Sequence, residues 1–347
     1  MIRVGIVGSN FGRNVLLPAF RLDSRCEVVA LAGSDAAKAA AVARDANVPQ
    51  AFGSWRELVA SDVDAVAIAT PPAIQPQVAT ETLKGGKAVF LEKPLAANWA
   101  DALSVREAAR TSARPVAIDF EFAELPAWRH AKALIDGGAL GPLRHAVVTW
   151  NVETYATQMR LQSWKTGGAG GGVLGNLASH TFYYLEQFCG PVRHLSARLT
   201  GLPDGSAGNE STVAMTFDYA SGAAGSATIS QASYLGSGHR IELYGEDGTL
   251  ILINSTADYM RGFELWHARR PAKTLERITV EPEADKHTDG RIAPVARIAG
   301  RFLDAIEGGA PMNPGIEEAC RVQQLIEAAR RSSEGRGETV EVAQRRT

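Results

Sequence analysis

Apolar runs and amphipathic segments alternate over the first third of the chain. The apolar runs predict strands at Arg3–Val7, Glu27–Ala32, Ala65–Ala69, Ala88–Leu91 and Val116–Phe120. The segments between them predict helices at Val15–Arg21, Asp35–Ala46, Gln75–Lys84 and Trp99–Thr111, with a short helix from Trp55 through Val59. Strands that alternate with helices at this spacing are typical of a doubly wound parallel sheet.

The pattern changes after about Glu124. Beyond a helix at about Ala127–Asp136, strand-like runs lie at Arg144–Glu153, His194–Leu199, Ser211–Tyr219, Ala224–Ala232, Arg240–Tyr244, Thr249–Ile253, Phe263–His267 and Leu275–Val280. A helix at about Leu174–Phe188 interrupts them. Two helices close the chain, and the last has Asn313 as its expected N-cap and Pro314 in its first turn. We therefore expect an α/β protein with a parallel-sheet domain at 1–122 and an α+β domain with a mostly antiparallel open sheet at 123–347.

Composition narrows the class of protein. The chain has 347 residues, of which 45% are hydrophobic and 21% charged, which indicates a soluble globular protein with two domains. A net charge of −2 gives no reason to expect nucleic-acid or membrane partners. The three cysteines are widely spaced, and the histidines show no metal-ligand spacing, so we predict no disulfide framework and no metal site. With no expected secretory signal or membrane span, these features favour the cytoplasm.

A glycine turn follows the first predicted strand. It reads Gly8-Ser9-Asn10-Phe11-Gly12 and leads into a helix, which is the setting of a dinucleotide-binding turn. The amino terminus of such a helix offers N–H groups and partial positive charge to a pyrophosphate. Asn10 replaces the usual second glycine, and the third glycine comes one place early, at Gly12. Asparagine tolerates left-handed φ, so the turn is expected to survive, although a plain tight turn is an alternative.

The end of the second predicted strand bears on the choice of cofactor. An acidic residue there would accept the ribose hydroxyls of NAD, but this chain has Gly33 followed by Ser34. Ser34 can donate to a 2′-phosphate, and Lys38 or Arg13 can supply positive charge, which favours NADP over NAD. Asp35 argues for NAD if the register shifts by two residues. A further interpretation is that Ser34 and Asp35 only cap the next helix.

Two later strand ends carry candidate chemistry. Thr70-Pro71-Pro72 lacks two successive N–H groups, so it stops a ladder and forms a stiff wall beside a dinucleotide. Glu92-Lys93-Pro94 places a lysine at the carboxyl end of a buried strand, where open α/β sheets bind ligands. Lys93 can donate to a substrate hydroxyl and stabilise an oxyanion. The structural alternatives are a loop that only stops the strand and a surface ion pair between Glu92 and Lys93.

These motifs, with others further along, resemble the glucose–fructose oxidoreductase, inositol dehydrogenase and MocA-like oxidoreductase family. The matching stretches, in order over nearly the whole chain, are 8–12, 69–72, 85–95, 170–174 up to Ser179-His180, 242–245, 248–250 and 302–329. The resemblance implies an N-terminal Rossmann domain and a C-terminal α/β domain whose open sheet often makes the subunit interface. It implies NAD or NADP as cofactor, a sugar, sugar derivative or cyclitol as substrate, a homodimer or homotetramer, and a cis Lys93–Pro94 bond.

The resemblance also assigns roles to residues. Lys93 looks like the substrate-hydroxyl lysine and His180 like the catalytic acid/base. Family members usually carry an aspartate four residues before that histidine, where this chain has Asn176, and a second three residues after it, where this chain has Tyr183. Asparagine can orient a hydroxyl or a ring but supplies no charge, so we expect a lower pKa for His180 than beside an aspartate. A buried packing role for His180 is the alternative.

The remaining candidates surround these positions. The residues expected to contact the cofactor are Gly8, Asn10, Phe11, Gly12, Ser34, Thr70, Pro71, Pro72, Gln75, Glu92 and Lys93, with Gln75 standing where the family often has histidine. Substrate contacts are expected from Glu121, Trp164 and Lys165, although core packing of Trp164 and a solvated loop around Asp119, Glu121 and Glu124 are alternatives. The departures at Asn176 and Tyr183 keep two other functions open: a regulator that binds NAD(P) without turnover, and a non-redox enzyme of lyase or hydrolase type.

Overall fold

The computed structural model describes residues 1–201, 210–281 and 287–343. The chain divides into two compact units that do not follow its order. The first unit combines Met1–Glu124 with Lys286–Gln323, and the second combines Leu125–Asp285 with Gln324–Thr347. The first break lies two residues beyond the predicted boundary at 122, but a later segment of the chain returns to the first unit.

The first unit is built on a parallel sheet of six strands. Their order is β3 (Gln50–Phe52), β2 (Cys26–Ala32), β1 (Ile2–Val7), β4 (Ala65–Ile68), β5 (Ala88–Leu91) and β6 (Val116–Ile118). The order reverses between β1 and β4, which is the switch point where doubly wound sheets bind ligands. The predicted Rossmann-type sheet is thus confirmed.

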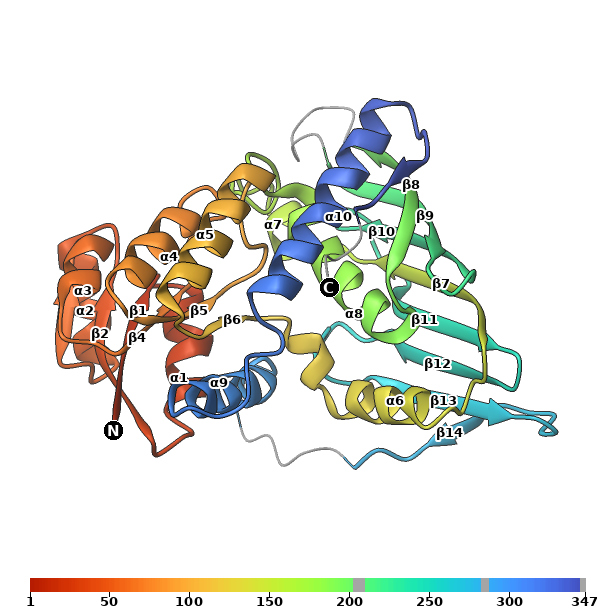
Figure 1. Cartoon of the computed structure of the whole chain (residues 1–347), viewed down its shortest axis with the longest axis horizontal. Helices are drawn as coiled ribbons and strands as arrows, with labels where there is room; N and C mark the ends of the chain where they lie inside the picture. The colour runs from red at the N-terminus through yellow and green to blue at the C-terminus, as the bar shows by residue number, and fades with distance from the viewer. Residues whose placement is uncertain (202–209, 282–286, 344–347) are drawn as a thin grey trace. The chain divides into compact units, whose positions relative to one another are not determined.

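Helices cover both faces of this sheet (Figure 1). One face carries α1 (Leu17–Phe20), α2 (Ala36–Asp45) and α9 (Ile292–Ile306), and the other carries α3 (Trp55–Ala60), α4 (Gln75–Lys84) and α5 (Trp99–Ser112). Phe20 of α1, Phe90 of β5 and Phe302 of α9 pack edge-to-face, with ring centroids 5.4 to 6.4 Å apart. Because α9 completes this core, residues near it belong to the first unit although they lie far along the chain.

The second unit is built on a mixed sheet of nine strands. Their order is β14 (Glu276–Ile278), β13 (Glu264–Arg269), β12 (Gly248–Asn254), β11 (Gly238–Gly245), β7 (Leu143–Asn151), β10 (Ala224–Ser230), β9 (Thr212–Tyr219), β8 (Val192–Thr200) and β15 (Val340–Glu341). Among the strand pairs that the structure describes in this second sheet, only the β7–β10 pair is parallel. The predicted mostly antiparallel sheet is therefore confirmed.

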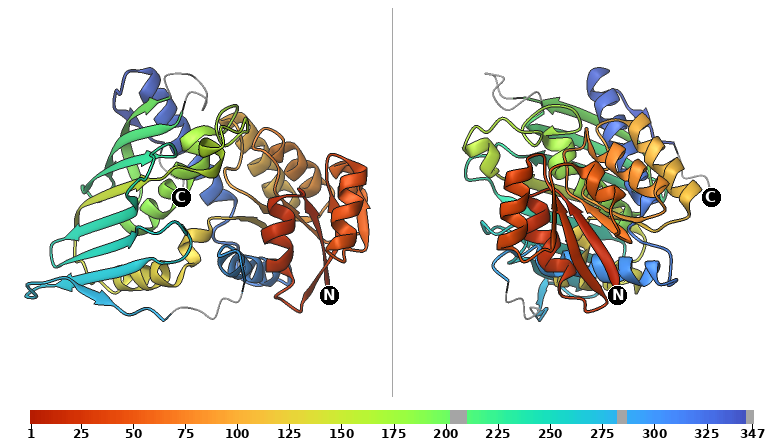
Figure 2. Two further views of the ribbon diagram at one scale, coloured as in Figure 1. Left: turned by 180° about the vertical axis from the view of Figure 1, so that it is seen from behind. Right: turned by 90° about the vertical axis from the view of Figure 1, so that its left-hand side faces the viewer.

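One face of this sheet is packed and the other is open. Helices α6 (Pro126–Asp136) and α8 (Ser179–Cys189) lie on the packed face (Figure 2). Burial along β9 alternates accordingly: Val213, Met215 and Phe217 are buried, whereas Ala214 and Thr216 are exposed. This period of two is what a strand with one solvated face requires.

Several local features differ from the sequence prediction. The edge strand β3 and the short helix α7 (Tyr155–Gln158) were not predicted, because neither has an apolar face that would produce a periodic pattern. The last helix, α10 (Ile316–Glu334), begins later than predicted, so Asn313 is not its N-cap. The carbonyl of Pro314 instead accepts from Ile118 N–H, and Gly315 pairs with Ala117, so this segment runs beside β6.

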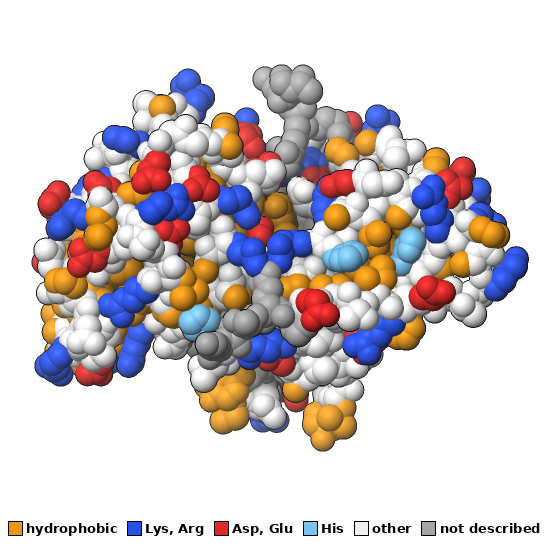
Figure 3. Space-filling model, turned by 90° about the horizontal axis from the view of Figure 1, so that it is seen from below, with side chains coloured by type: hydrophobic (Ala, Val, Ile, Leu, Met, Phe, Trp, Pro, Cys, Tyr) orange, Lys and Arg blue, Asp and Glu red, His pale blue; other side chains and the backbone are white. Residues whose placement is uncertain are grey.

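The surface carries both signs of charge. Lysine and arginine side chains are interspersed with aspartate and glutamate on the face that Figure 3 shows, consistent with the net charge of −2. Among the helices that the structure describes, none has the length and apolar character needed to cross a membrane.

Candidate active site

The glycine turn is shaped by a close approach of two strand ends. Gly8 has a φ of +118°, and a Cβ there would lie 2.4 Å from the carbonyl oxygen of Ala69. A Cβ on Gly12 would lie 2.7 Å from the side chain of Ile6. Both positions therefore require glycine, and the exposed backbone between them precedes the helical turn Gly12–Leu16 that leads into α1. This geometry fits a bound pyrophosphate.

Asn10 supports the turn differently from the expectation. It does not adopt a left-handed φ. Its carbonyl instead accepts from Asn14 N–H at 3.0 Å, and its side-chain oxygen accepts from the Asn14 amide at 3.3 Å. Asn10 thus begins the helix, which is why an asparagine replaces a glycine here without strain.

The end of β2 presents a small residue and a capping carboxylate. A Cβ on Gly33 would meet Ala39 at 3.5 Å, an ordinary contact, so packing does not demand glycine there. Ser34 is exposed. Asp35 is the N-cap of α2, and its carboxylate accepts from Lys38 N–H at 2.9 Å. Asp35 therefore caps α2, whereas the interpretation that this segment does nothing else stays untested.

Gln75 holds the corner that carries Lys93. The Gln75 amide nitrogen lies 2.5 Å from the carbonyl oxygen of Glu92, 2.9 Å from that of Pro94 and 3.3 Å from that of Leu95, and the side chain is 1% exposed. The Lys93–Pro94 bond is cis, as the family resemblance implies. Gln75 thus fixes the main chain on both sides of Lys93, a role that sequence reasoning missed when it placed Gln75 only against the cofactor.

The Thr70-Pro71-Pro72 segment both ends β4 and starts α4. The Pro71 carbonyl accepts from Ile74 N–H at 2.9 Å and from Gln75 N–H at 3.0 Å. Pro72 is buried, whereas Pro71 is exposed. The segment is a stiff connection at the carboxyl edge of the sheet, as predicted, and its contact with a cofactor stays a prediction.

Buried carboxyl groups lie near the Lys93 corner. Asp119 is completely buried, and its burial, followed by the negative charges of Glu121 and Glu92, raises its pKa well above the ordinary value, against the opposing charge of Lys93. Glu121 is 5% exposed. Glu124 accepts from the Arg301 guanidinium at 2.6 Å. The solvated-loop alternative for this segment is therefore wrong.

In the second unit, His180 lies among aromatic side chains. It is 4% exposed and sits in the first turn of α8, directly after the π-type turn Leu174–Ala178. Its ring centroid is 6.3 Å from that of Trp150, which stacks on His239 at 4.2 Å. His239 Nε2 bonds the Tyr184 hydroxyl at 3.0 Å, and burial lowers the pKa of His239 to about 3. Turns of this type often mark functional sites.

Asn176 belongs to a buried chain of hydrogen bonds. Its side-chain nitrogen donates to Gln231 Oε1 at 3.0 Å, and Gln231 Nε2 donates to the carbonyl oxygen of Lys165 at 3.0 Å. Gln231 is completely buried and Asn176 is 8% exposed. Sequence reasoning missed Gln231, which directly follows β10.

Trp164 and Lys165 lie on the loop that the glycine run supports. A Cβ on Gly171 would fall 1.6 Å from the Trp164 carbonyl oxygen, so glycine allows the two backbones to touch. The Lys165 ammonium lies 5.7 Å from the centre of the Trp164 ring. Trp164 is half-buried and Lys165 is exposed, so neither is a core residue.

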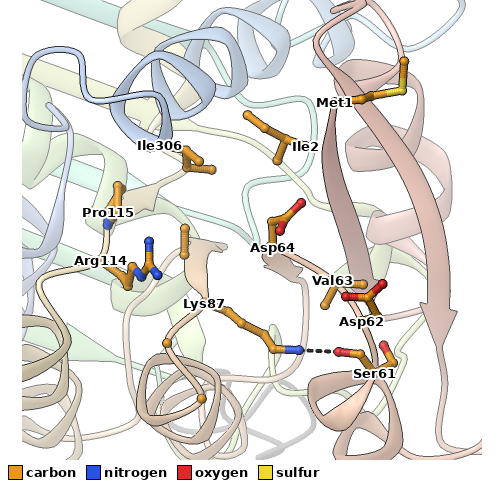
Figure 4. A pocket seen from close by; sticks show the side chains of 13 residues that line it. Met1, Ile2, Ser61, Asp62, Val63, Asp64, Lys87, Arg114, Pro115 and Ile306 are labelled. Atoms are coloured by element: carbon orange, nitrogen blue, oxygen red, sulfur yellow. Dashed lines mark hydrogen bonds between the residues drawn. The ribbon is translucent and has the colours of Figure 1, made fainter.

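A cavity of about 490 Å³ lies in the first unit (Figure 4). It is lined by the segments that precede β4, β5 and β6, at the amino edge of the sheet. Lys87 donates there to the Ser61 carbonyl, and burial lowers the pKa of Lys87 against the charges of Asp62 and Asp64. The glycine turn and Lys93 are at the opposite, carboxyl edge. Among the described residues, no group of histidines, cysteines or carboxylates is arranged to hold a metal ion.

A Rossmann sheet with this glycine turn, joined to a mixed-sheet unit, defines a dinucleotide-dependent oxidoreductase. The family model described as the NAD-binding Rossmann fold of the oxidoreductase family matches residues 2–120, and that of the family's C-terminal alpha/beta domain matches 132–342. The chain belongs to the GFO/IDH/MocA oxidoreductase family.

Individual relatives agree with this assignment. An uncharacterized oxidoreductase of Synechocystis is 31% identical over 95% of this chain and 94% of its own length. Inositol 2-dehydrogenase 3 of Saccharopolyspora erythraea is 32% identical over 46% of this chain and 49% of its own length. The solved structure of an NAD binding oxidoreductase from Klebsiella pneumoniae aligns with a TM-score of 0.85 and 25% identity over 99% of both chains.

Proposed function

We propose that this enzyme transfers a hydride between a nicotinamide and a hydroxyl or carbonyl carbon of a sugar, sugar derivative or cyclitol. The observation that carries the proposal is the Lys93 corner, where the buried amide of Gln75 fixes a half-buried lysine at the carboxyl end of β5. The match to an inositol dehydrogenase supports a polyol as the substrate class.

Each candidate residue has a distinct role. Lys93 holds the reacting oxygen and stabilises negative charge on it. His180 takes the hydroxyl proton in oxidation and returns it in reduction. Asn176 orients the hydroxyl or the imidazole by hydrogen bonding. Bound NAD(P) supplies the hydride acceptor or donor, while the protein supplies position and polarity. Glu121, Trp164 and Lys165 are the proposed further contacts to substrate.

We infer a preference for NADP over NAD. Gly33 places no carboxylate at the end of β2, although a Cβ would meet only an ordinary contact there. Ser34, Arg13 and Lys38 are exposed and can meet a 2′-phosphate. Asp35 is already occupied in capping α2. Separate titrations with NADPH and NADH test the preference, and equal or tighter binding of NADH contradicts it.

We also infer assembly and compartment. The open face of the second sheet is the surface through which we expect a homodimer or homotetramer. Its alternating exposed residues leave a broad face for a second copy. The three cysteines are free and buried, which suits a reducing compartment such as the cytoplasm. Light scattering measures the assembly, and a monomer at micromolar concentration contradicts that part of the proposal.

A panel of polyols, aldoses and cyclitols, assayed with both cofactors in each direction, tests the proposed reaction. We expect reduced nicotinamide to form or disappear with at least one substrate class. Tight cofactor binding without any change in nicotinamide absorbance over the panel would instead favour a regulator, which Asn176 and Tyr183 keep open as the second candidate. Substrate consumption without such a change would favour a non-redox reaction.

A further inference from the structure

We propose that Gln231 is a positioning residue that sets the orientation of the Asn176 amide and ties it to the loop carrying Trp164 and Lys165. The inference rests on the proposed function for its catalytic consequence. Its structural part stands on the hydrogen bonds alone. All of the groups involved lie in the second unit.

The direction of the chain of bonds is determined at one end. A backbone carbonyl only accepts hydrogen bonds, so the Lys165 oxygen requires Nε2 of Gln231, at 3.0 Å. Oε1 of Gln231 is then turned toward Asn176 and only accepts. Asn176 must therefore present its side-chain nitrogen, at 3.0 Å, and its Oδ1 is turned away from Gln231.

Gln231 has little freedom to change this arrangement. Its side chain is completely buried. Its backbone N–H donates to the Ser211 carbonyl at 3.0 Å, and its own carbonyl accepts from Thr154 N–H at 3.0 Å. Rotating the amide by half a turn would bring Oε1 against the Lys165 carbonyl and leave two buried acceptors facing each other. The rotation would break both side-chain hydrogen bonds of Gln231, and leaving buried acceptors without a donor costs more free energy than the loss of one ordinary hydrogen bond.

The consequence is that Gln231 fixes the direction of the Asn176 amide, which the proposed function uses to orient the substrate hydroxyl or the imidazole. Position 176 precedes His180 by four residues, across the junction of the π-type turn and α8, so the two side chains share a helix face. The same glutamine also fixes the main chain at Lys165, next to Trp164. Gln231 thus acts on two things: the orientation of Asn176, which affects turnover, and the loop, which affects substrate binding.

A double-mutant cycle separates these effects. In the otherwise unchanged full-length enzyme, Gln231→Leu should lower kcat on the order of tenfold to a hundredfold and raise the substrate KM, with cofactor affinity unchanged. In an Asn176→Leu background, Gln231→Leu should change kcat by less than about twofold yet still raise KM. Gln187→Leu, at a half-buried glutamine of α8, is the matched control and should change neither.

The outcomes are decisive. A full loss of kcat from Gln231→Leu in both backgrounds would show a general structural effect and overturn the positioning role. If the enzyme turns over no substrate, the proposed function is wrong. The same double-mutant cycle can then be measured by the free energy of unfolding of each variant. Non-additive losses there would support the Asn176–Gln231 bond, whereas strictly additive losses would overturn it.

Discussion

Two glutamines hold the two candidate reaction centres, and they do so in different ways. The side-chain amide of Gln75 donates to main-chain carbonyls of the Lys93 corner. Gln231 connects a side chain, Asn176, to a main-chain carbonyl at Lys165. The first arrangement fixes the backbone around residue 93 and does not depend on which side chain position 93 carries. The second fixes the direction of one particular amide, so it depends on which residue occupies position 176.

The surroundings of the two centres also differ in charge. Near Lys93 the buried groups are acids, and the pKa of Asp119 is raised by burial and then by Glu121 and Glu92. Near His180 lies a buried base, His239, whose pKa is lowered by burial. The first unit therefore places buried carboxyl groups beside a cation, whereas the second surrounds its histidine with aromatic groups.

The largest effect is expected at Lys93. Lys93→Met removes the donor while keeping most of the side chain's length, so turnover should fall on the order of a thousandfold. Cofactor affinity, measured by nicotinamide fluorescence, should stay within about twofold. Lys84→Met, at an exposed lysine of α4, is the matched control. Equal losses of turnover and cofactor affinity would show that Lys93 serves cofactor binding and not the reacting oxygen.

The next largest effect is expected at Gln75, whose amide bonds the carbonyls on both sides of Lys93. Gln75→Leu leaves buried carbonyls of the corner without their donor, so the free energy of unfolding should fall by about 1–3 kcal/mol, as measured by urea denaturation. Gln77→Leu, at an exposed position of the same helix, should change it by about 0.5 kcal/mol or less. Similar losses in both variants would mean that these hydrogen bonds contribute nothing specific.

These two positions show how far sequence reasoning reaches. The parallel sheet and the lysine at the end of β5 were predictable because buried strands and their stops leave local patterns. The role of Gln75 was not, because its partners lie 17 to 20 residues away and are carbonyls, which every residue has. Gln231 binds Asn176 across 55 residues. The sequence also could not predict that α9 packs in the core of the first unit, because an amphipathic pattern predicts a buried face but not the sheet that it covers.

A buried base and a buried acid, each held neutral by burial, predict opposite responses of stability to pH. His239 is neutral when folded but protonates on unfolding below its ordinary pKa of 6.5, so the free energy of unfolding should fall as the pH drops from 6.5 toward 3. The slope from this group is at most about 1.4 kcal/mol per pH unit. His239→Phe should reduce the slope of stability against pH between pH 5 and 6, as measured by urea denaturation.

Asp119→Asn provides the contrasting variant. The folded state retains the Asp119 proton above the ordinary pKa of 3.8, so this group lowers stability as the pH rises. Removing it should make the rise of stability with pH steeper, in the sense opposite to His239→Phe. Changes of the same sign in both variants would refute the contrast between a buried acid in one unit and a buried base in the other.

The smallest effect is expected from restoring a carboxylate at position 176. In Asn176→Asp an oxygen replaces the donor that faces Gln231 Oε1, and Gln231 cannot rotate without losing Lys165. At neutral pH the free energy of unfolding should fall by about 1 kcal/mol. Because burial beside an acceptor raises the pKa of the new carboxyl, this loss should disappear as the pH falls and the group protonates. Asn176→Leu offers no proton to titrate, so its loss should not recover in acid. If Asn176→Asp is as stable as the parent at neutral pH, Gln231 does not dictate the donor at position 176. The hydrogen bonds around position 176 would then depend as little on the side chain there as the bonds of Gln75 depend on the side chain at position 93.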